Sequence, residues 1–131
     1  MADWYFHYTS QVAAQMIRAS GWIWGSSDRV VYLTDELYGT HGDAADFLGI
    51  PVVGPAVGTQ FGMVQLTKPV EMVCCIPRQL LNSSPLYGPY LAAPFWDNST
   101  GRLIYKGGGR EFRYPDPIRV AGLPWVSLVQ P

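Results

Sequence analysis

Apolar residues in this chain recur at intervals that predict many short strands and few helices. Residues 4–8 form an aromatic run of strong β character, which ends at Thr9 and Ser10, two residues that can cap a helix. Over residues 11–19 the apolar positions have helical spacing, and Gly21 follows where such a helix would end. The pattern therefore predicts one strand and then one short amphipathic helix at the start of the chain.

Further strands are expected wherever β-branched and aromatic residues cluster between turn residues. These segments are 29–34, 63–66, 70–76, 103–106, 111–114, 118–120 and 125–129, with a brief extended piece at 22–24 and a helical turn at 43–48. Segment 70–76 is almost continuously apolar, which indicates a strand buried on both faces. Residues 49–62 are rich in Pro and Gly and predict a surface loop. Residues 77–96 predict irregular structure with one short helix at 78–81.

Length and composition favour a single folded domain over residues 1–131. Hydrophobic residues make up 48% of the 131 positions and charged residues 15%, which is too apolar for a disordered chain. Together with the strand pattern, this predicts an α+β domain with one or two short helices. The aromatic share of 14% is compatible with two uses, a ring-filled core or flat surfaces that stack on a planar ligand.

The charge balance gives little direction toward a partner. A net charge of −1 provides no overall attraction to nucleic acid. Five basic residues lie within one short stretch and could either face a phosphate-bearing ligand or solvate a surface: Arg102, Lys106, Arg110, Arg113 and Arg119.

The cysteines favour a reducing compartment, and the sequence shows no targeting or membrane-spanning segment. Adjacent cysteines such as Cys74 and Cys75 rarely close a disulfide, so we expect reduced core residues. The cysteines and the two distant histidines lack metal-ligand spacing, and we expect no metal. No signal peptide and no apolar run of about 18 residues is visible. We therefore expect a cytoplasmic protein without membrane association.

Four short motifs follow one another in a particular order along the chain. They are Phe6-His7-Tyr8-Thr9-Ser10, Ala19-Ser20-Gly21, Val31-Tyr32-Leu33-Thr34 and Gly109-Arg110-Glu111-Phe112. This order is similar to that of the ADP-ribosyltransferase superfamily of the His-Tyr-Glu/Asp type, and most of all to short bacterial polymorphic-toxin domains that open with His-Tyr-Thr-Ser. The resemblance spans roughly residues 7–120. It implies a split β-sandwich fold and NAD⁺ as a substrate.

The resemblance implies roles for particular residues. Glu111 would accept a hydrogen bond from the nicotinamide ribose and stabilise an oxocarbenium-like transition state. His7 would bind the adenosine-side ribose and hold the dinucleotide bent, and Tyr32 would stack on nicotinamide. Further residues expected at the NAD⁺ site are Tyr8, Thr9, Ser10 and Tyr38, the last as a cover for the other face of nicotinamide. Without the resemblance, His7 and Tyr32 are ordinary strand residues, and Thr9 and Ser10 are explained equally well as helix caps.

The acid at the third motif position departs from many of the toxin domains, which carry Asp there. Asp116 is the competing acid, but it lies between two prolines in a typical turn sequence. Glu111 begins an expected strand directly after the glycines at 107–109, where the family places its acid, and is preferred. The glycines predict a mobile loop. Arginine-modifying members carry a second Glu where this chain has Gly109, which disfavours an arginine acceptor.

The expected activity is a toxin-type transfer of ADP-ribose from NAD⁺ to a macromolecule, either protein or nucleic acid. It would take place in the cytoplasm of the producing or the target cell, and a cognate immunity protein or antitoxin is a candidate partner. Two alternatives stay open: an NAD glycohydrolase, in which water is the acceptor, and a non-enzymatic β-rich binding module. An RNA 2′-phosphotransferase of related fold is disfavoured, because the paired basic residues expected near its N-terminus are absent.

Overall fold

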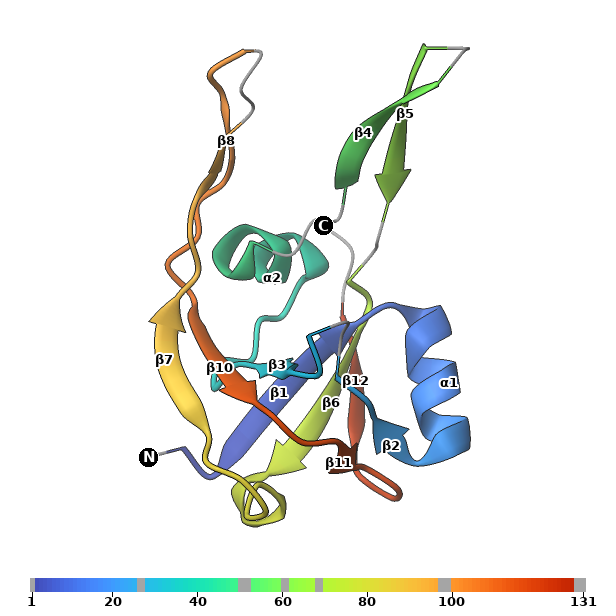
Figure 1. The fold of residues 1–131 in the computed structure, drawn as a ribbon, viewed down its shortest axis with the longest axis vertical. Helices are drawn as coiled ribbons and strands as arrows, with labels where there is room; N and C mark the ends of the chain where they lie inside the picture. The colour runs from blue at the N-terminus through green and yellow to red at the C-terminus, as the bar shows by residue number, and fades with distance from the viewer. Residues whose placement is uncertain are drawn as a thin grey trace.

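The computed structural model describes residues 2–25, 28–49, 53–59, 62–67, 70–96 and 100–128, and these form a mixed α+β structure (Figure 1). The helices are α1 (Gln11–Ser20), α2 (His41–Leu48) and the 3₁₀ turn η1 (Arg78–Leu80). The strands are β1 (Trp4–Thr9), β2 (Trp22–Ile23), β3 (Val31–Leu33), β4 (Val53–Thr59), β5 (Gly62–Thr67), β6 (Met72–Pro77), β7 (Tyr87–Leu91), β8 (Phe95–Trp96), β9 (Leu103–Tyr105), β10 (Arg110–Tyr114), β11 (Ile118–Arg119) and β12 (Trp125–Ser127). The predicted α+β class is confirmed at this level.

Helix α1 forms where the apolar spacing and its flanking residues predict it. The Ser10 side chain accepts a hydrogen bond from the backbone N–H of Ala13 at 3.1 Å, which satisfies a donor at the helix start. Gly21 has φ of 78°, and its N–H donates to the carbonyl of Ile17 at 2.7 Å. A left-handed residue of this kind favours glycine and ends the helix.

The two largest sheets are antiparallel and three-stranded, with the strand orders β1-β6-β12 and β3-β10-β7. A bridge between Phe6 and Thr34 connects them: Phe6 N donates to Thr34 O at 2.7 Å, and Thr34 N donates to Phe6 O at 3.0 Å. The bridge joins β1 to the residue that follows β3. Residues His7 and Tyr32, which are 25 positions apart in the chain, therefore become neighbours.

The core consists of two apolar clusters on opposite faces of β6. Cys74 and Ile76 belong to the larger cluster, whereas Val73 belongs to the smaller one that packs beneath α2. Because successive side chains of a strand point to opposite faces, this alternation buries β6 on both sides, as its apolar sequence predicts. Cys74 and Cys75 are buried free thiols, and burial raises the pKa of Cys74 to about 12.

The prediction of a surface loop over residues 49–62 is wrong for most of its described part. Residues 53–59 form β4, which pairs with β5 in a hairpin that projects from the domain (Figure 1). The pairing register shifts between Val53 and Ala56, the interval that contains Pro55. Within the described residues β4 pairs with β5 alone, and an edge strand tolerates a proline that lacks an N–H.

Residues 77–96 are also more regular than the sequence predicts. The short helix is confirmed as η1, but β7 and β8 lie where irregular structure was expected. The same physical reason applies, because Pro89 lies in β7, the edge strand of its sheet. The strands β8 and β9 form a second projecting ribbon on the other side of α2 (Figure 1). The remaining predicted strands are confirmed, with longer bounds for β1, β5 and β10 and shorter bounds for the others, and Val129 lies outside the described residues.

Among the described residues, neither α1 nor α2 has the length and apolar character that crossing a membrane would require.

Candidate active site

A cavity of about 350 Å³ opens where β1, β3 and β10 come together with the end of α2. The residues that line it are Phe6, His7, Tyr8, Tyr32, Leu33, Thr34, Leu48, Gly49 and Glu111. Its volume falls within the range of small-molecule sites, which is about 300–1,000 Å³. His7, Tyr32 and Glu111, the three residues to which the sequence resemblance assigns catalysis, therefore border one cavity from three different strands.

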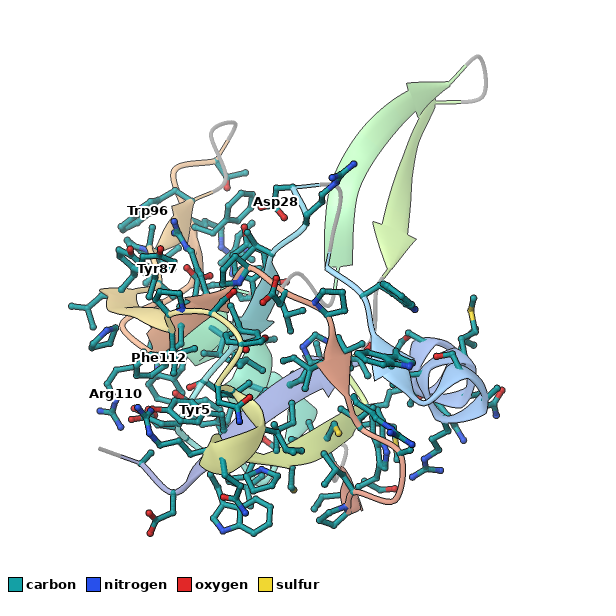
Figure 2. The ribbon with its side chains drawn as sticks, turned by 60° about the horizontal axis from the view of Figure 1, so that its bottom comes forward. Tyr5, Asp28, Tyr87, Trp96, Arg110 and Phe112 are labelled. Carbon is teal, nitrogen blue, oxygen red and sulfur yellow. The ribbon has the colours of Figure 1, made fainter. Side chains whose placement is uncertain are left out.

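The alternation of side chains along β10 directs Glu111 toward this cavity. Phe112 and Tyr114 are buried, whereas Glu111 and Arg113 lie on the opposite face of the strand. The ring of Phe112 packs edge-to-face against Tyr5 with their centroids 5.0 Å apart, in the interior of the molecule (Figure 2). This core contact fixes the orientation of β10, and with it the side on which the carboxylate lies.

His7 is held as a neutral hydrogen-bonding group. Its Nδ1 lies 3.0 Å from the carbonyl oxygen of Tyr32, and because a carbonyl only accepts, Nδ1 carries the proton. Burial lowers the pKa of His7, and the hydrogen bond to Tyr32 opposes that shift only in part. At neutral pH the ring is therefore uncharged, and its Nε2 is an acceptor.

Tyr32 lines the cavity, and its hydroxyl is hydrogen-bonded to a residue that does not line it. The side chain is 38% exposed, and its hydroxyl donates to Asp28 Oδ2. This hydrogen bond is the main cause that raises the pKa of Tyr32, so the phenol stays protonated. A ring fixed in this way can stack on a flat ligand without ordering a flexible side chain first.

Glu111 contributes a carboxylate that is held by one of its two oxygens. Its Oε2 accepts hydrogen bonds from Arg113 Nε at 3.2 Å and Arg113 Nη2 at 3.1 Å. Within the described part of the chain no hydrogen bond involves Oε1. The site therefore combines a neutral imidazole, an anchored phenol ring and a carboxylate oxygen that is available to a ligand.

Asp116, the competing acid, lies in a different environment. Its Oδ2 accepts hydrogen bonds from the hydroxyls of Ser84 and Ser83, and these two bonds lower the pKa of Asp116 below its usual value. The neighbouring Tyr114 hydroxyl accepts from the backbone N–H of Ser83 at 3.0 Å. Asp116 does not line the cavity, so its contacts are those of a residue that secures the loop at 83–84.

Of the remaining predicted site residues, Tyr8 lines the cavity, whereas Ser10 and Tyr38 make structural contacts elsewhere. Tyr8 lines the cavity, but its hydroxyl donates to Glu36 O at 2.8 Å, and burial raises its pKa to about 12. Ser10 caps α1. Tyr38 stacks on Phe47 with centroids 5.3 Å apart and is not among the cavity-lining residues. Its expected contact with nicotinamide therefore does not fit this arrangement.

A second hollow of about 650 Å³ borders some of the same residues as the cavity. Both hollows share His7, Tyr8 and Tyr32. The other residues of the second hollow come from α1, β2, β3 and the segments beside these elements: Thr9, Ala13, Met16, Ile17, Ser20, Trp22, Ile23, Trp24, Val30 and Val31. Trp22 and Trp24 stack with centroids 5.8 Å apart, and Trp24 is 66% exposed. Neither indole was predicted as a site residue, although the alternation Trp22-Ile23-Trp24 places both on one face.

The glycines at 107–109 do not form the mobile loop that the sequence predicts. Their amides donate in turn to the carbonyls of Asp46 at 2.8 Å, Ala92 at 2.8 Å and Phe47 at 2.9 Å. A Cβ at Gly109 would lie 2.7 Å from the carbonyl oxygen of Phe47. Glycine is needed here for close backbone approach rather than for flexibility. The segment fixes α2, which ends at the cavity residue Leu48 and is capped by Gly49, to the strand that carries Glu111.

The clustered basic residues are largely neutralised. Arg110 pairs with Asp35 at 2.8 Å and with Glu36 at 3.0 Å, and Lys106 pairs with Asp46 at 3.4 Å. These ion pairs are partly exposed, and each contributes little to the free energy of unfolding. Of the two readings open for this stretch, a solvated and paired surface fits these residues better than a phosphate-facing patch.

Comparison with protein-family models, with curated proteins and with solved structures found no match to this chain. Within the described residues, no three His, Cys, Asp or Glu side chains gather in a group that could hold a metal ion.

Proposed function

We propose that this chain is an ADP-ribosyltransferase of the His-Tyr-Glu type with a split β-sandwich fold, and that it cleaves NAD⁺ between nicotinamide and ribose. The observation that carries the proposal is the convergence of His7, Tyr32 and Glu111 on one cavity. The motif order in the sequence suggested these three residues without reference to their positions in space. Three residues that are far apart in the chain, and that were chosen from the motif order alone, would seldom border the same small cavity by chance.

In this proposal the NAD⁺ molecule spans both hollows. The nicotinamide and its ribose occupy the cavity beside Tyr32 and Glu111, and the adenosine end passes His7 into the hollow at Trp22 and Trp24. The indole rings supply flat apolar surface for a purine base. The neutral His7 ring accepts a hydrogen bond from a hydroxyl of the adenosine ribose through Nε2, which is positioning rather than proton transfer.

The proposed reaction breaks one bond and forms another. The electron pair of the bond between nicotinamide and the ribose C1′ leaves with nicotinamide, which becomes neutral, and positive charge develops on the sugar ring. The Glu111 carboxylate stabilises that charge electrostatically and accepts a hydrogen bond from the ribose. A nucleophile of the acceptor then attacks C1′ and gives up its proton to solvent.

The acceptor in this proposal is a macromolecule. The resemblance to toxin domains suggests a second partner, a cognate immunity protein or antitoxin. Exposed apolar side chains on β7 and the ribbon beyond it support a macromolecular contact: Tyr87, Tyr90, Leu91, Phe95, Trp96, Leu103 and Ile104. Exposed apolar side chains that form a contiguous patch commonly mark an interaction site. The strand β7 pairs directly with β10, so a macromolecule bound there would lie next to the cavity.

Labelled NAD⁺ tests the proposal. The protein is incubated with a cell lysate and NAD⁺ that carries the label on the adenylate phosphate, beside the Glu111→Gln and Asp116→Asn variants. We expect a labelled protein or nucleic-acid band with the wild type and with Asp116→Asn, and none with Glu111→Gln. Free ADP-ribose without a band would indicate the glycohydrolase, and unchanged NAD⁺ in all samples would favour the binding module.

A further inference from the structure

Arg113 contacts the proposed catalytic carboxylate from outside the cavity. Two of its nitrogens, Nε and Nη2, donate to the same Glu111 oxygen, Oε2, at 3.2 and 3.1 Å. Arg113 is not among the residues that line the cavity, whereas Glu111 is. The guanidinium therefore holds one oxygen of the carboxylate, Oε2, and leaves Oε1 to a ligand.

Aromatic rings on the two neighbouring strands hold the guanidinium. Its Cζ lies 4.3 Å from the ring centroid of Tyr90 on β7 and 5.9 Å from that of Tyr32 on β3. Both separations allow cation–π attraction, which reaches to about 6 Å. The hydrogen bond with Glu111 is the main cause that raises the pKa of Arg113, so the guanidinium stays charged.

The register of the sheet produces this arrangement. Arg113 lies opposite Tyr32 on β3 and opposite Tyr87 on β7, and Glu111 lies opposite Tyr90. The pairing of β10 with β7 shifts between Glu111 and Arg113. Such an irregularity re-aims side chains at sheet edges and next to functional sites. Here it lies between the carboxylate and the arginine that binds it.

Arg110, on the same strand, provides a direct contrast. The side chains of Arg110 and Arg113 are each 45% exposed, and each forms an ion pair. The partners of Arg110 are Asp35 and Glu36, which do not line the cavity, and Arg110 lies at the outer edge of the molecule (Figure 2). The two arginines therefore differ in whether their partner faces the cavity.

We propose that Arg113 is a positioning residue for the transfer reaction, which holds Glu111 so that Oε1 faces the nicotinamide ribose; the inference rests on the proposed function. A glutamate side chain has three rotatable bonds, and a partly exposed carboxylate would otherwise adopt several rotamers. Two donors that bind the same oxygen restrict the Glu111 side chain to one of these rotamers. Preorganised charge is what electrostatic stabilisation of a transition state needs.

The positive charge of Arg113 also screens the carboxylate, and the two effects have opposite signs. Orientation predicts slower turnover when Arg113 is removed, whereas screening predicts faster turnover. Arg113 binds Oε2 and does not line the cavity, so our proposal places Oε1 nearer to the ligand than the guanidinium. The orienting effect therefore dominates in our proposal, and the sign of the change is a direct test.

The test measures nicotinamide release from NAD⁺ by the wild type and by Arg113→Gln, Arg113→Lys and the matched control Arg110→Gln. We expect Arg113→Gln to lower kcat by roughly 10- to 100-fold, with little change in KM, since misplacement of a catalytic group has effects of this size. Arg113→Lys keeps the charge but not the paired donors and should recover part of the loss. Arg110→Gln should keep wild-type kcat. Melting curves confirm that each variant is folded.

A double variant shows whether Arg113 acts through Glu111. Adding Arg113→Gln to Glu111→Gln should cause no further loss of turnover, because the group that Arg113 positions is already replaced. If Arg113→Gln retains or exceeds wild-type kcat while Glu111→Gln is inactive, the inference is overturned and the proposed function stands. If the wild type itself releases no nicotinamide, the proposed function fails, and the inference fails with it.

Discussion

The two faces of β10 show how one short strand serves both stability and the proposed chemistry. On one face Phe112 and Tyr114 are buried in the larger apolar cluster, and on the other Glu111 and Arg113 form an ion pair at the cavity. Just beyond the strand, Asp116 is bound to two serine hydroxyls. Two carboxylates five positions apart therefore have different environments, and substitutions on each side should have different consequences.

The largest effect is expected on the buried face. Phe112→Ala removes a ring that packs against Tyr5 in the core and should lower the free energy of unfolding by about 3–5 kcal/mol. Urea denaturation measures this change. A loss below about 1 kcal/mol would contradict the view that Phe112 fixes the orientation of β10.

On the cavity face, Glu111→Gln should change activity and leave stability almost untouched. We expect nicotinamide release to fall by about 10²–10³-fold, the size found when one stabilising group is removed from a transition state. The free energy of unfolding should change by no more than about 0.5 kcal/mol, as for a surface substitution. Full activity in Glu111→Gln would remove Glu111 from the mechanism.

A smaller effect is expected on the pH dependence of stability, through the cavity residue His7. Burial lowers the pKa of His7 in the folded state, so the unfolded chain binds the proton more readily. Stability should therefore fall as the pH decreases below the unfolded value of about 6.5. The side chain in the His7→Gln variant does not titrate, so this variant should lose less stability than the wild type below about pH 6.5. Melting temperatures of both proteins below about pH 6.5 measure the difference, and identical slopes would count against an imidazole that the fold holds neutral.

The smallest effect is expected at Asp116. Hydrogen bonds from Ser84 and Ser83 lower its folded-state pKa, so they stabilise the fold above the unfolded pKa, about 3.9, and this contribution is lost as the pH falls through the folded value. Asp116→Asn should therefore melt slightly lower at neutral pH, with the difference shrinking in acid, and turn over NAD⁺ as the wild type does. Loss of turnover in Asp116→Asn would exchange the roles of the two acids.

Local signals explain which parts of the fold the sequence could predict. Ser10 and Gly21 determine the ends of α1 through contacts with residues close in the chain, and the apolar run of β6 reflects burial on both faces. The strands β4, β7 and β8 were missed, because proline and glycine rules do not distinguish a loop from an edge strand. Whether a strand has a free edge depends on distant residues.

The candidate site shows the same division between local and distant information. The motif order pointed to His7, Tyr32 and Glu111, and the structure brings them to one cavity. The sequence does not predict the stacking of Trp22 on Trp24, and it predicts a mobile loop where the glycines at 107–109 are held by hydrogen bonds. In both cases the deciding contacts are made with segments that the local sequence does not specify. The ion pair of Glu111 with Arg113 likewise depends on the sheet register.

A crystal structure with carba-NAD shows whether His7, Tyr32 and Glu111 surround one NAD⁺ molecule, as we propose. This analogue has a carbon in place of the ring oxygen of the nicotinamide ribose and therefore resists cleavage. We predict nicotinamide against the Tyr32 ring, a ribose hydroxyl at Glu111 Oε1 and an adenosine-ribose hydroxyl at His7 Nε2. Binding at a place remote from these residues, or no binding at millimolar analogue, would contradict the account.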